Sequence, residues 1–312
     1  MAVKLALVHS DEYANWIFYE NHPTQGRRFL NARRMFLECA STKSALISEV
    51  SPRLATHVEL ERVHSKEYVQ EVTTQHRCNE WSGTREDLAH LAQLFVGGTL
   101  IGLDLLLKGE ADIAIHFPGA KHHAQYNYSS GFCVFADFAL AADVATKDYG
   151  KRVAILDFDA HHGDGTENLT KENKGVLTFS IHEYGIFPGT GYESFPEQLV
   201  HNYPLGSVIE GHDRYKNDEA LMRGVTSFVE EAKAFSPDVI FVACGADGHE
   251  EDPLTSLQFT SKGFISVAHT LRQEFPGVPL LVGGAGGYLP DTRTPEMWSQ
   301  FACALLEGST NR

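Results

Sequence analysis

Cysteine is scarce in this chain, and its spacing excludes two common uses of the residue. The five cysteines are far apart, odd in number and without a Cys-x-x-Cys pair. Neither a disulfide framework nor a thiolate zinc site is therefore expected, and a reducing compartment is the simplest interpretation. The positions are Cys39, Cys78, Cys133, Cys244 and Cys303.

Positive charge and long hydrophobic runs are also scarce. Lysine and arginine number 26 against 41 aspartates and glutamates, a formal net charge of -15, and non-specific nucleic-acid binding needs a basic surface instead. No stretch approaches the roughly 18 apolar residues of a membrane span. The apolar start, MAVKLALVHS, meets Asp11 and Glu12 before it reaches the length of a secretion signal. We expect a cytoplasmic protein that binds neither nucleic acid nor membrane, and the oligomeric state stays open.

Hydrophobic residues, by contrast, are sufficient for a large core. The chain has 312 residues, of which 43% are hydrophobic, so it can bury a core without help from disulfides. It has no repeat period, low-complexity tract or long linker. A single domain over residues 1–312 is therefore predicted.

The pattern of apolar residues predicts an α/β fold. Short β-branched and aliphatic runs, typical of strands buried on both faces of a parallel sheet, alternate with stretches of helical spacing. This order predicts a mostly parallel central sheet flanked by helices on both faces. Two stretches without a period, 184–203 and 249–258, are expected to be loops. Strands are predicted at 3–8, 111–117, 152–159, 175–182, 238–247 and 279–284, and helices at 88–107, 135–147, 215–235, 260–275 and 295–306.

Polar side chains follow five of the predicted strands, where a parallel sheet places its ligand crevice. Asp157 and Asp159 are expected on one face of their strand, with His161 following in the same sense. Asp247 arrives from another strand. Two carboxylates and an imidazole suit Zn²⁺ with an open fourth position, which indicates a catalytic metal. The alternative, that these residues cap and solvate a loop, would leave buried carboxylates without a compensating cation.

Seven motifs, in this order, make the chain resemble the zinc-dependent histone deacetylase family, whose members have the arginase/deacetylase α/β fold. Each is short, but their order and spacing along nearly the whole chain are specific. They are VHSKEYV with His64 and Tyr68, the His122-His123 pair, GFC at 131–133, DFDAHHGDG at 157–165, SIHEYGIFPGTG at 180–191, CGAD at 244–247 followed by DPL at 252–254, and GGAGGY at 283–288.

The resemblance implies a role for each matching residue. Asp159, His161 and Asp247 would bind Zn²⁺. His122 and His123 would lie beside the reacting water, partnered by Asp157 and Asp164, and Tyr288 would donate to the substrate carbonyl. A tunnel for an acyl-lysine side chain would be walled by Gly131, Phe132 and Phe187 with Leu254 at its rim, and a monovalent cation, usually K⁺, would be held by Asp157, Asp159, His161, Ser180 and Ile181.

The chemistry of these residues agrees with hydrolysis of an amide. Zn²⁺ lowers the pKa of bound water to about 7 and polarises a carbonyl. An imidazole can take the proton of that water and return it to the leaving amine. Tyr288, after a Gly-rich turn, can donate to the developing oxyanion. The predicted function is a deacetylase that acts on N6-acetyl-lysine or a similar acylated amine and releases acetate; Fe²⁺ or Co²⁺ could replace Zn²⁺.

Two departures from the family pattern concern the site. The segment NHPTQGRRF keeps His22, Pro23 and Arg28, but Gly26 stands where many relatives have proline. Leu254 is apolar, whereas members that prefer acetylated polyamines tend to carry an acidic residue there. A protein-like or neutral acyl-lysine substrate is therefore favoured.

Three alternatives remain. A deacylase of a small-molecule amide, such as an acetylated polyamine or a natural product, is compatible with the same residues. A binuclear manganese ureohydrolase shares the fold, but Asp164 comes one residue too late after Asp159-Ala160-His161, and His249 interrupts the later Asp-x-Asp pair. A catalytically silent binding module is disfavoured by the intact set of residues that includes Tyr288.

Overall fold

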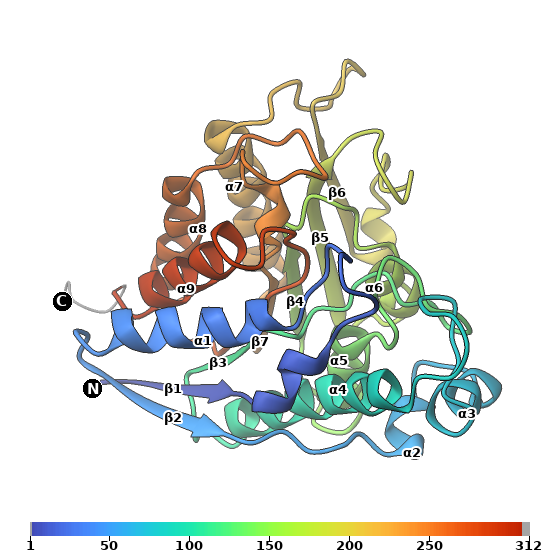
Figure 1. The fold of residues 1–312 in the computed structure, drawn as a ribbon. Coiled ribbons are helices and arrows are strands. Elements are labelled where there is room, and N and C mark those ends of the chain that lie inside the picture. The colour runs from blue at the N-terminus through green and yellow to red at the C-terminus, as the bar shows by residue number, and fades with distance from the viewer. Residues whose placement is uncertain (1, 308–312) are drawn as a thin grey trace.

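A single parallel sheet forms the centre of the computed structural model, which describes residues 2–307 (Figure 1). Its strands lie in the order β2-β1-β3-β8-β7-β4-β5-β6, and every neighbouring pair is parallel. The fold class is therefore confirmed. The strands are β1 Val3–Val8, β2 Ala45–Val50, β3 Ile113–His116, β4 Val153–Asp157, β5 Val176–Glu183, β6 Val200–Leu205, β7 Val239–Ala243 and β8 Leu280–Gly283.

Helices cover both faces of the sheet. On one face α1, α9, α8 and α7 pack side by side in that order, and on the other α4 packs against α5, which packs against α6 (Figure 1). The helices are α1 Arg27–Ala40, α2 His57–Leu60, α3 Lys66–Thr73, α4 Glu86–Leu107, α5 Asp137–Lys147, α6 Asp164–Thr170, α7 Asp218–Phe235, α8 Ser261–Glu274 and α9 Arg293–Leu305.

The central strands β3, β8, β7 and β4 are buried along their whole length. Because helices cover both faces, these strands are continuous apolar runs, and the sequence predicts them well. The edge strand β6 is VHNYPL and is buried at only three of its six positions. It begins inside the stretch 184–203 that was expected to be a loop, so that prediction was wrong there. An edge strand tolerates Asn202 and Pro204, which hide it from a search for apolar runs.

Two of the strands end at least two residues before their predicted ends. β4 ends at Asp157 and β7 ends at Ala243, so Asp159, His161 and Asp247 do not lie on strands. The expected alternation of Asp157 and Asp159 on one strand face was therefore wrong. These side chains reach the edge of the sheet from the segments that follow the two strands.

Helix α4 corrects the expectation that no stretch is apolar enough to span a membrane. By length and composition Glu86–Leu107 passes that test, but 67% of its most apolar window is buried inside the protein. It packs against β1, β3, β8 and α5. Burial on several sides explains why this helix is apolar around most of its circumference.

The cysteines also differ from expectation. Cys39 and Cys303 form a disulfide that joins the C-terminal turns of α1 and α9. These two helices lie side by side, so cysteines 264 residues apart in the sequence come together. No Cys spacing could have indicated this pair. The other three cysteines are free thiols.

Candidate active site

Five adjacent strands, β3, β8, β7, β4 and β5, supply the candidate site at their carboxyl ends. The register pairs Asp157 with Ala243 on one side and with Ser180 on the other, and it pairs Ala243 with Gly283. The ends of β4, β7 and β8 are therefore level. The loops that follow these strands meet at one point, as expected for an open parallel sheet.

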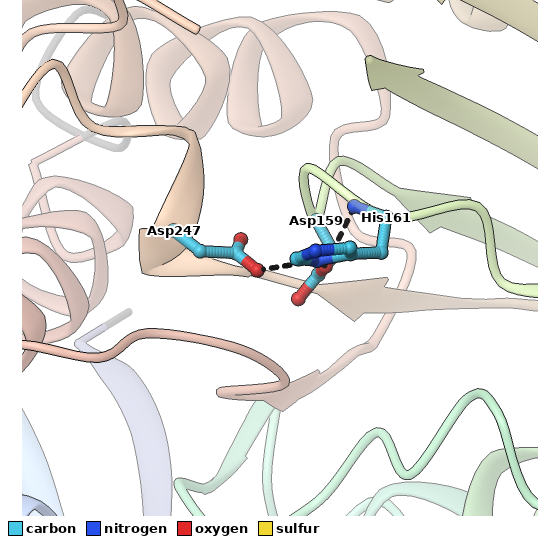
Figure 2. A group of neighbouring side chains, drawn as sticks. All are labelled: Asp159, His161 and Asp247. Carbon is cyan, nitrogen blue, oxygen red and sulfur yellow. Dashed lines mark hydrogen bonds and ion pairs between the residues drawn. The ribbon is translucent and has the colours of Figure 1, made fainter. Parts of the chain in front are cut away.

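Asp159, His161 and Asp247 form a buried group whose ligand atoms lie within 4.8 Å of one another (Figure 2). Nδ1 of His161 is 2.9 Å from Oδ2 of Asp247 and 3.2 Å from Oδ1 of Asp159. Backbone N–H groups hold both carboxylates: Gly286 donates to Asp159 at 2.6 Å, and Ala160 donates to Asp247 at 3.0 Å. Because the carboxylates are fixed by the backbone, their oxygens converge without rearrangement.

The electrostatics of this group favour a bound cation. Burial, together with the charge of Asp159, raises the pKa of Asp247 to about 7. Burial lowers the pKa of His161, but hydrogen bonds to Asp159 and Asp247 outweigh it and raise the pKa to about 11. Two buried carboxylates this close repel each other unless positive charge lies between them. The donor set, two carboxylates and one imidazole, therefore fits a divalent metal ion such as Zn²⁺.

His122 and His123 are two buried imidazoles whose ring centroids lie 4.0 Å apart. Their Nδ1 atoms turn to different carboxylates, since His122 is 2.7 Å from Asp157 and His123 is 2.7 Å from Asp164. Both expected partnerships are present. With Nδ1 engaged, Nε2 of each ring is left for the reaction, and Nε2 of His122 lies 3.7 Å from Asp159.

The two imidazoles differ strongly in basicity. Burial disfavours the cation of His122, but the charges of Asp157 and Asp159 raise its pKa to about 9. Burial and the neighbouring charge of His122 lower the pKa of His123 to about 3. At neutral pH the pair therefore holds one proton, and His123 is the member that is neutral.

Tyr288 follows a turn that depends on glycine. A Cβ at Gly286 would lie 2.3 Å from Oδ2 of Asp247, so only glycine lets the chain pass this close to the carboxylates. The N–H of Tyr288 donates to Asp252 at 2.9 Å. Burial and the charges of Asp247 and Asp159 raise the pKa of Tyr288 well above its ordinary value. The phenol is therefore protonated at neutral pH and can act as a donor.

Two aromatic rings flank the histidines. Phe187 lies edge-on to His123 with centroids 5.0 Å apart, and Phe132 lies 6.2 Å from Tyr288. Gly131 has φ of 55°, and a Cβ there would lie 2.4 Å from the ring of His123, which explains glycine at this position. Phe187 and Leu254 are 49% and 45% exposed. These positions agree with the predicted walls and rim of a substrate tunnel. That the residues line such a tunnel stays a prediction.

The predicted monovalent-cation residues lie on or directly after the neighbouring strands β4 and β5. Ser180 and Ile181 belong to β5, and Ser180 is the register partner of Asp157. Oδ1 of Asp157 accepts the N–H of Asp159 at 3.1 Å. The five residues thus come from two neighbouring strand ends, and their binding of K⁺ stays a prediction.

Comparison with known proteins identifies the family. Residues 22–305 match the model of the histone deacetylase domain. The chain belongs to the histone deacetylase family. It is 31% identical to the acetoin utilization protein AcuC of Staphylococcus aureus (strain MRSA252), over 97% of this chain and 82% of that protein. It is 32% identical to AcuC of Bacillus subtilis (strain 168), over 94% and 80% of the two chains.

A solved structure supports the same fold. The HD domain of HDA15 superposes with a TM-score of 0.83, at 24% identity, over 99% of this chain and 91% of that one. The resemblance stated from the motifs is therefore confirmed. As a member of the histone deacetylase family, the protein is a hydrolase that acts on linear amides.

The binuclear alternative finds no support in this histone deacetylase-family site. Among residues 2–307, Asp159, His161 and Asp247 are the one group of three or more His, Cys, Asp or Glu side chains arranged to hold a metal ion. His249 is instead held by its own loop, where Nδ1 accepts the N–H of Glu251 at 3.2 Å.

Two residues at the site were not predicted to act there. Arg28, on α1, donates through Nη1 to the carbonyl of Gly287 at 2.5 Å, directly before Tyr288. Lys121 precedes the histidine pair and is 6% exposed. The one sequence signal for Lys121 is a charged residue directly after a buried strand. Arg28 gave no signal beyond its place in the segment NHPTQGRRF, which resembles the family pattern in part.

Proposed function

We propose that the protein is a zinc-dependent deacetylase that hydrolyses the amide of N6-acetyl-lysine, or of a similar acylated amine, and releases acetate. The observation that carries the proposal is the meeting of three buried metal-ligand side chains with two histidine–carboxylate pairs at one sheet edge. Asp159, His161 and Asp247 would hold the metal. When bound, Zn²⁺ would polarise the carbonyl and make water more acidic.

The histidine pair would move the protons. His123 is neutral and its Nδ1 is held by Asp164, so Nε2 would accept a proton from the attacking water. His122, partnered by Asp157, carries the raised pKa and would supply positive charge beside the reacting atoms. The proton taken up by the pair would then pass to the leaving nitrogen, which departs as a neutral amine.

Tyr288 would stabilise the charge that develops on the carbonyl oxygen. Its hydroxyl is protonated at neutral pH because burial and two nearby carboxylates raise its pKa. The hydrogen bond that its N–H donates to Asp252 fixes the turn, so the hydroxyl is oriented before the substrate arrives. K⁺ bound near Asp157 and Ser180 would stabilise the neighbouring strands β4 and β5 where they approach the site.

The substrate class is proposed from the rim. Phe187 and Leu254 are partly exposed and apolar, which suits the aliphatic stem of an acyl-lysine, and neither side chain can pair with the charge of a polyamine. The alternative, a deacylase of a small-molecule amide, differs in the carrier of the acyl group and not in the catalytic residues.

The test is release of acetate from a panel of acetyl-lysine peptides and N-acetylated small amines by the zinc-loaded protein. Turnover on peptides supports the main proposal, and turnover on free amines alone supports the alternative. Tyr288→Phe is the control for turnover at this site. Zinc binding with no turnover on either class contradicts deacetylation and favours a binding module.

A further inference from the structure

A buried carboxylate holds the backbone directly before the histidine pair. Asp137 is the first residue of α5, and its side chain is buried. Its Oδ2 accepts the N–H of Ala120 at 3.0 Å, and its Oδ1 accepts the N–H of Lys121 at 2.6 Å. His122 follows Lys121 at once. One carboxylate therefore fixes the two peptide groups that lead into the pair.

The conformation of this backbone needs such support. Ala120 has φ of 64°, in the left-handed region that residues other than glycine rarely adopt. Backbone of this kind persists only where the surrounding contacts determine it. The two N–H groups that Asp137 accepts lie on either side of the α-carbon of Ala120. Together they hold both torsion angles of that residue.

Asp137 is itself oriented by a chain of three other buried side chains. The hydroxyl of Thr99, on α4, donates to Oδ2 of Asp137 at 2.5 Å. Nδ1 of His116 lies 3.0 Å from that hydroxyl, and Nε2 of His116 lies 2.9 Å from the hydroxyl of Tyr13. All four residues are 0% exposed, so water does not compete for these hydrogen bonds.

The hydrogen bonds of this chain run in one direction. Asp137 accepts two backbone N–H groups, and the N-terminus of α5 favours its negative charge, so the hydroxyl of Thr99 donates to it. Thr99 is then the acceptor for Nδ1–H of His116, and Nε2 of that ring accepts from Tyr13. His116 must be neutral to do both, and burial lowers its pKa to about 3.

We propose that Asp137 is a positioning residue for the reaction, which acts through the backbone of residues 120–121 to set where the imidazoles of the histidine pair point. Thr99 acts through Asp137, and His116 with Tyr13 fixes Thr99. This inference rests on the proposed function for the reaction that the pair serves. None of the four residues belongs to the metal-ligand group. Their loss should therefore slow the chemical step and leave the affinity for zinc unchanged.

Two substitutions weaken the chain to different degrees. In Asp137→Asn the amide has only one oxygen and cannot accept both N–H groups. Thr99→Val keeps the shape of the side chain and removes only the hydroxyl, and it carries the test if Asp137→Asn does not fold. Thr99→Ser restores the hydroxyl and is the rescue variant. Thr146→Val is the matched control, because the Thr146 hydroxyl donates to a carbonyl of its own helix, α5, at 2.8 Å.

Kinetics of the zinc-loaded protein separate positioning from stability. Asp137→Asn should lower kcat roughly 100-fold and Thr99→Val roughly tenfold, because a misplacement of about 1 Å can cost on the order of 10² in rate. KM for an acetylated peptide and the Kd for zinc should stay at their native values. Thr99→Ser should recover most of the lost kcat, and Thr146→Val should lose none. All assays are run well below the Tm of each variant.

Hydrogen exchange of the segment 118–123 gives a readout that needs no turnover. Exchange there should be faster in Asp137→Asn and Thr99→Val than in the native protein and in Thr146→Val. A native kcat in both variants would overturn the positioning role, and so would a kcat lost in Thr99→Val that Thr99→Ser does not recover. A native protein without turnover would refute deacetylation, and faster exchange in its variants would still support the hold of Asp137 on this loop.

Discussion

Nδ1 of His161 lies 2.9 Å from Oδ2 of Asp247, although the two residues are 86 positions apart in the sequence. The loops after β4 and β7 bring them together because these strands are neighbours in the sheet. Asp159 completes the group from the same loop as His161. One strand pairing therefore decides whether the candidate metal site exists.

Loss of either carboxylate should weaken metal binding strongly. In Asp159→Asn or Asp247→Asn an anionic ligand becomes a weak neutral one. The Kd for zinc should therefore rise roughly 100-fold or more, a larger effect than is typical when a residue that only hydrogen-bonds to a metal ligand is lost. Competition with a chelating dye measures this Kd. The exposed Glu250→Gln is the control and should bind like the native protein. Unchanged zinc affinity in both aspartate variants would rule out this ligand set.

Tyr288→Phe should separate metal binding from catalysis. The hydroxyl would donate to the substrate carbonyl oxygen and does not bind the metal. Zinc affinity should therefore be unchanged while kcat falls by roughly 10² to 10³. Steady-state kinetics with an acetylated peptide and zinc titration of the same sample measure both quantities. Tyr126→Phe, at an exposed tyrosine, is the matched control. Full activity in Tyr288→Phe would contradict the donor role.

His64 should make the protein sensitive to acid. Its Nδ1 donates to the carbonyl of Gln125 at 2.8 Å, its Nε2 accepts the N–H of Ala136 at 2.9 Å, and burial lowers its pKa to about 4. The unfolded chain, with an ordinary pKa near 6.5, binds a proton there that the folded protein does not. The contribution of His64 to the free energy of unfolding is therefore fully present above about pH 6.5. It is lost as pH falls toward 4, by up to about 3 kcal/mol.

His64→Gln provides the measurement of this effect. Glutamine keeps one donor and one acceptor but does not titrate. The free energy of unfolding in urea should therefore fall less steeply between pH 6.5 and 4 in the variant than in the native protein. The exposed His57→Gln is the control and should follow the native curve. A variant curve parallel to the native one would show that His64 is not held neutral.

The Cys39–Cys303 disulfide should be detectable by peptide mapping without reductant. The linkage closes a loop of most of the chain, so Cys39→Ser with Cys303→Ser should lower the free energy of unfolding by roughly 2–4 kcal/mol. Cys78→Ser, at a free thiol, should have no comparable effect. Rapid alkylation of both Cys39 and Cys303 in the unreduced native protein would contradict the bond.

The amino-acid sequence by itself determined the central strands and the chemistry at their ends. β3, β4, β7 and β8 are apolar runs because they are buried on both faces, and burial on both faces leaves a pattern that needs no structure to read. Metal-ligand residue types directly after such runs predicted the ligand group, and the resemblance of the motifs to a known family predicted both histidine–carboxylate pairs.

Tertiary structure alone decided what depends on distant segments packing together. The edge strand β6 pairs with β5 alone and is buried at three of its six positions, and the disulfide joins helices from opposite ends of the chain. Arg28 and Lys121 border one cavity because α1 packs beside the loop after β3. A sequence does not distinguish a buried charged residue from an exposed one. The atoms that surround the residue in the folded protein decide whether its charge has a partner.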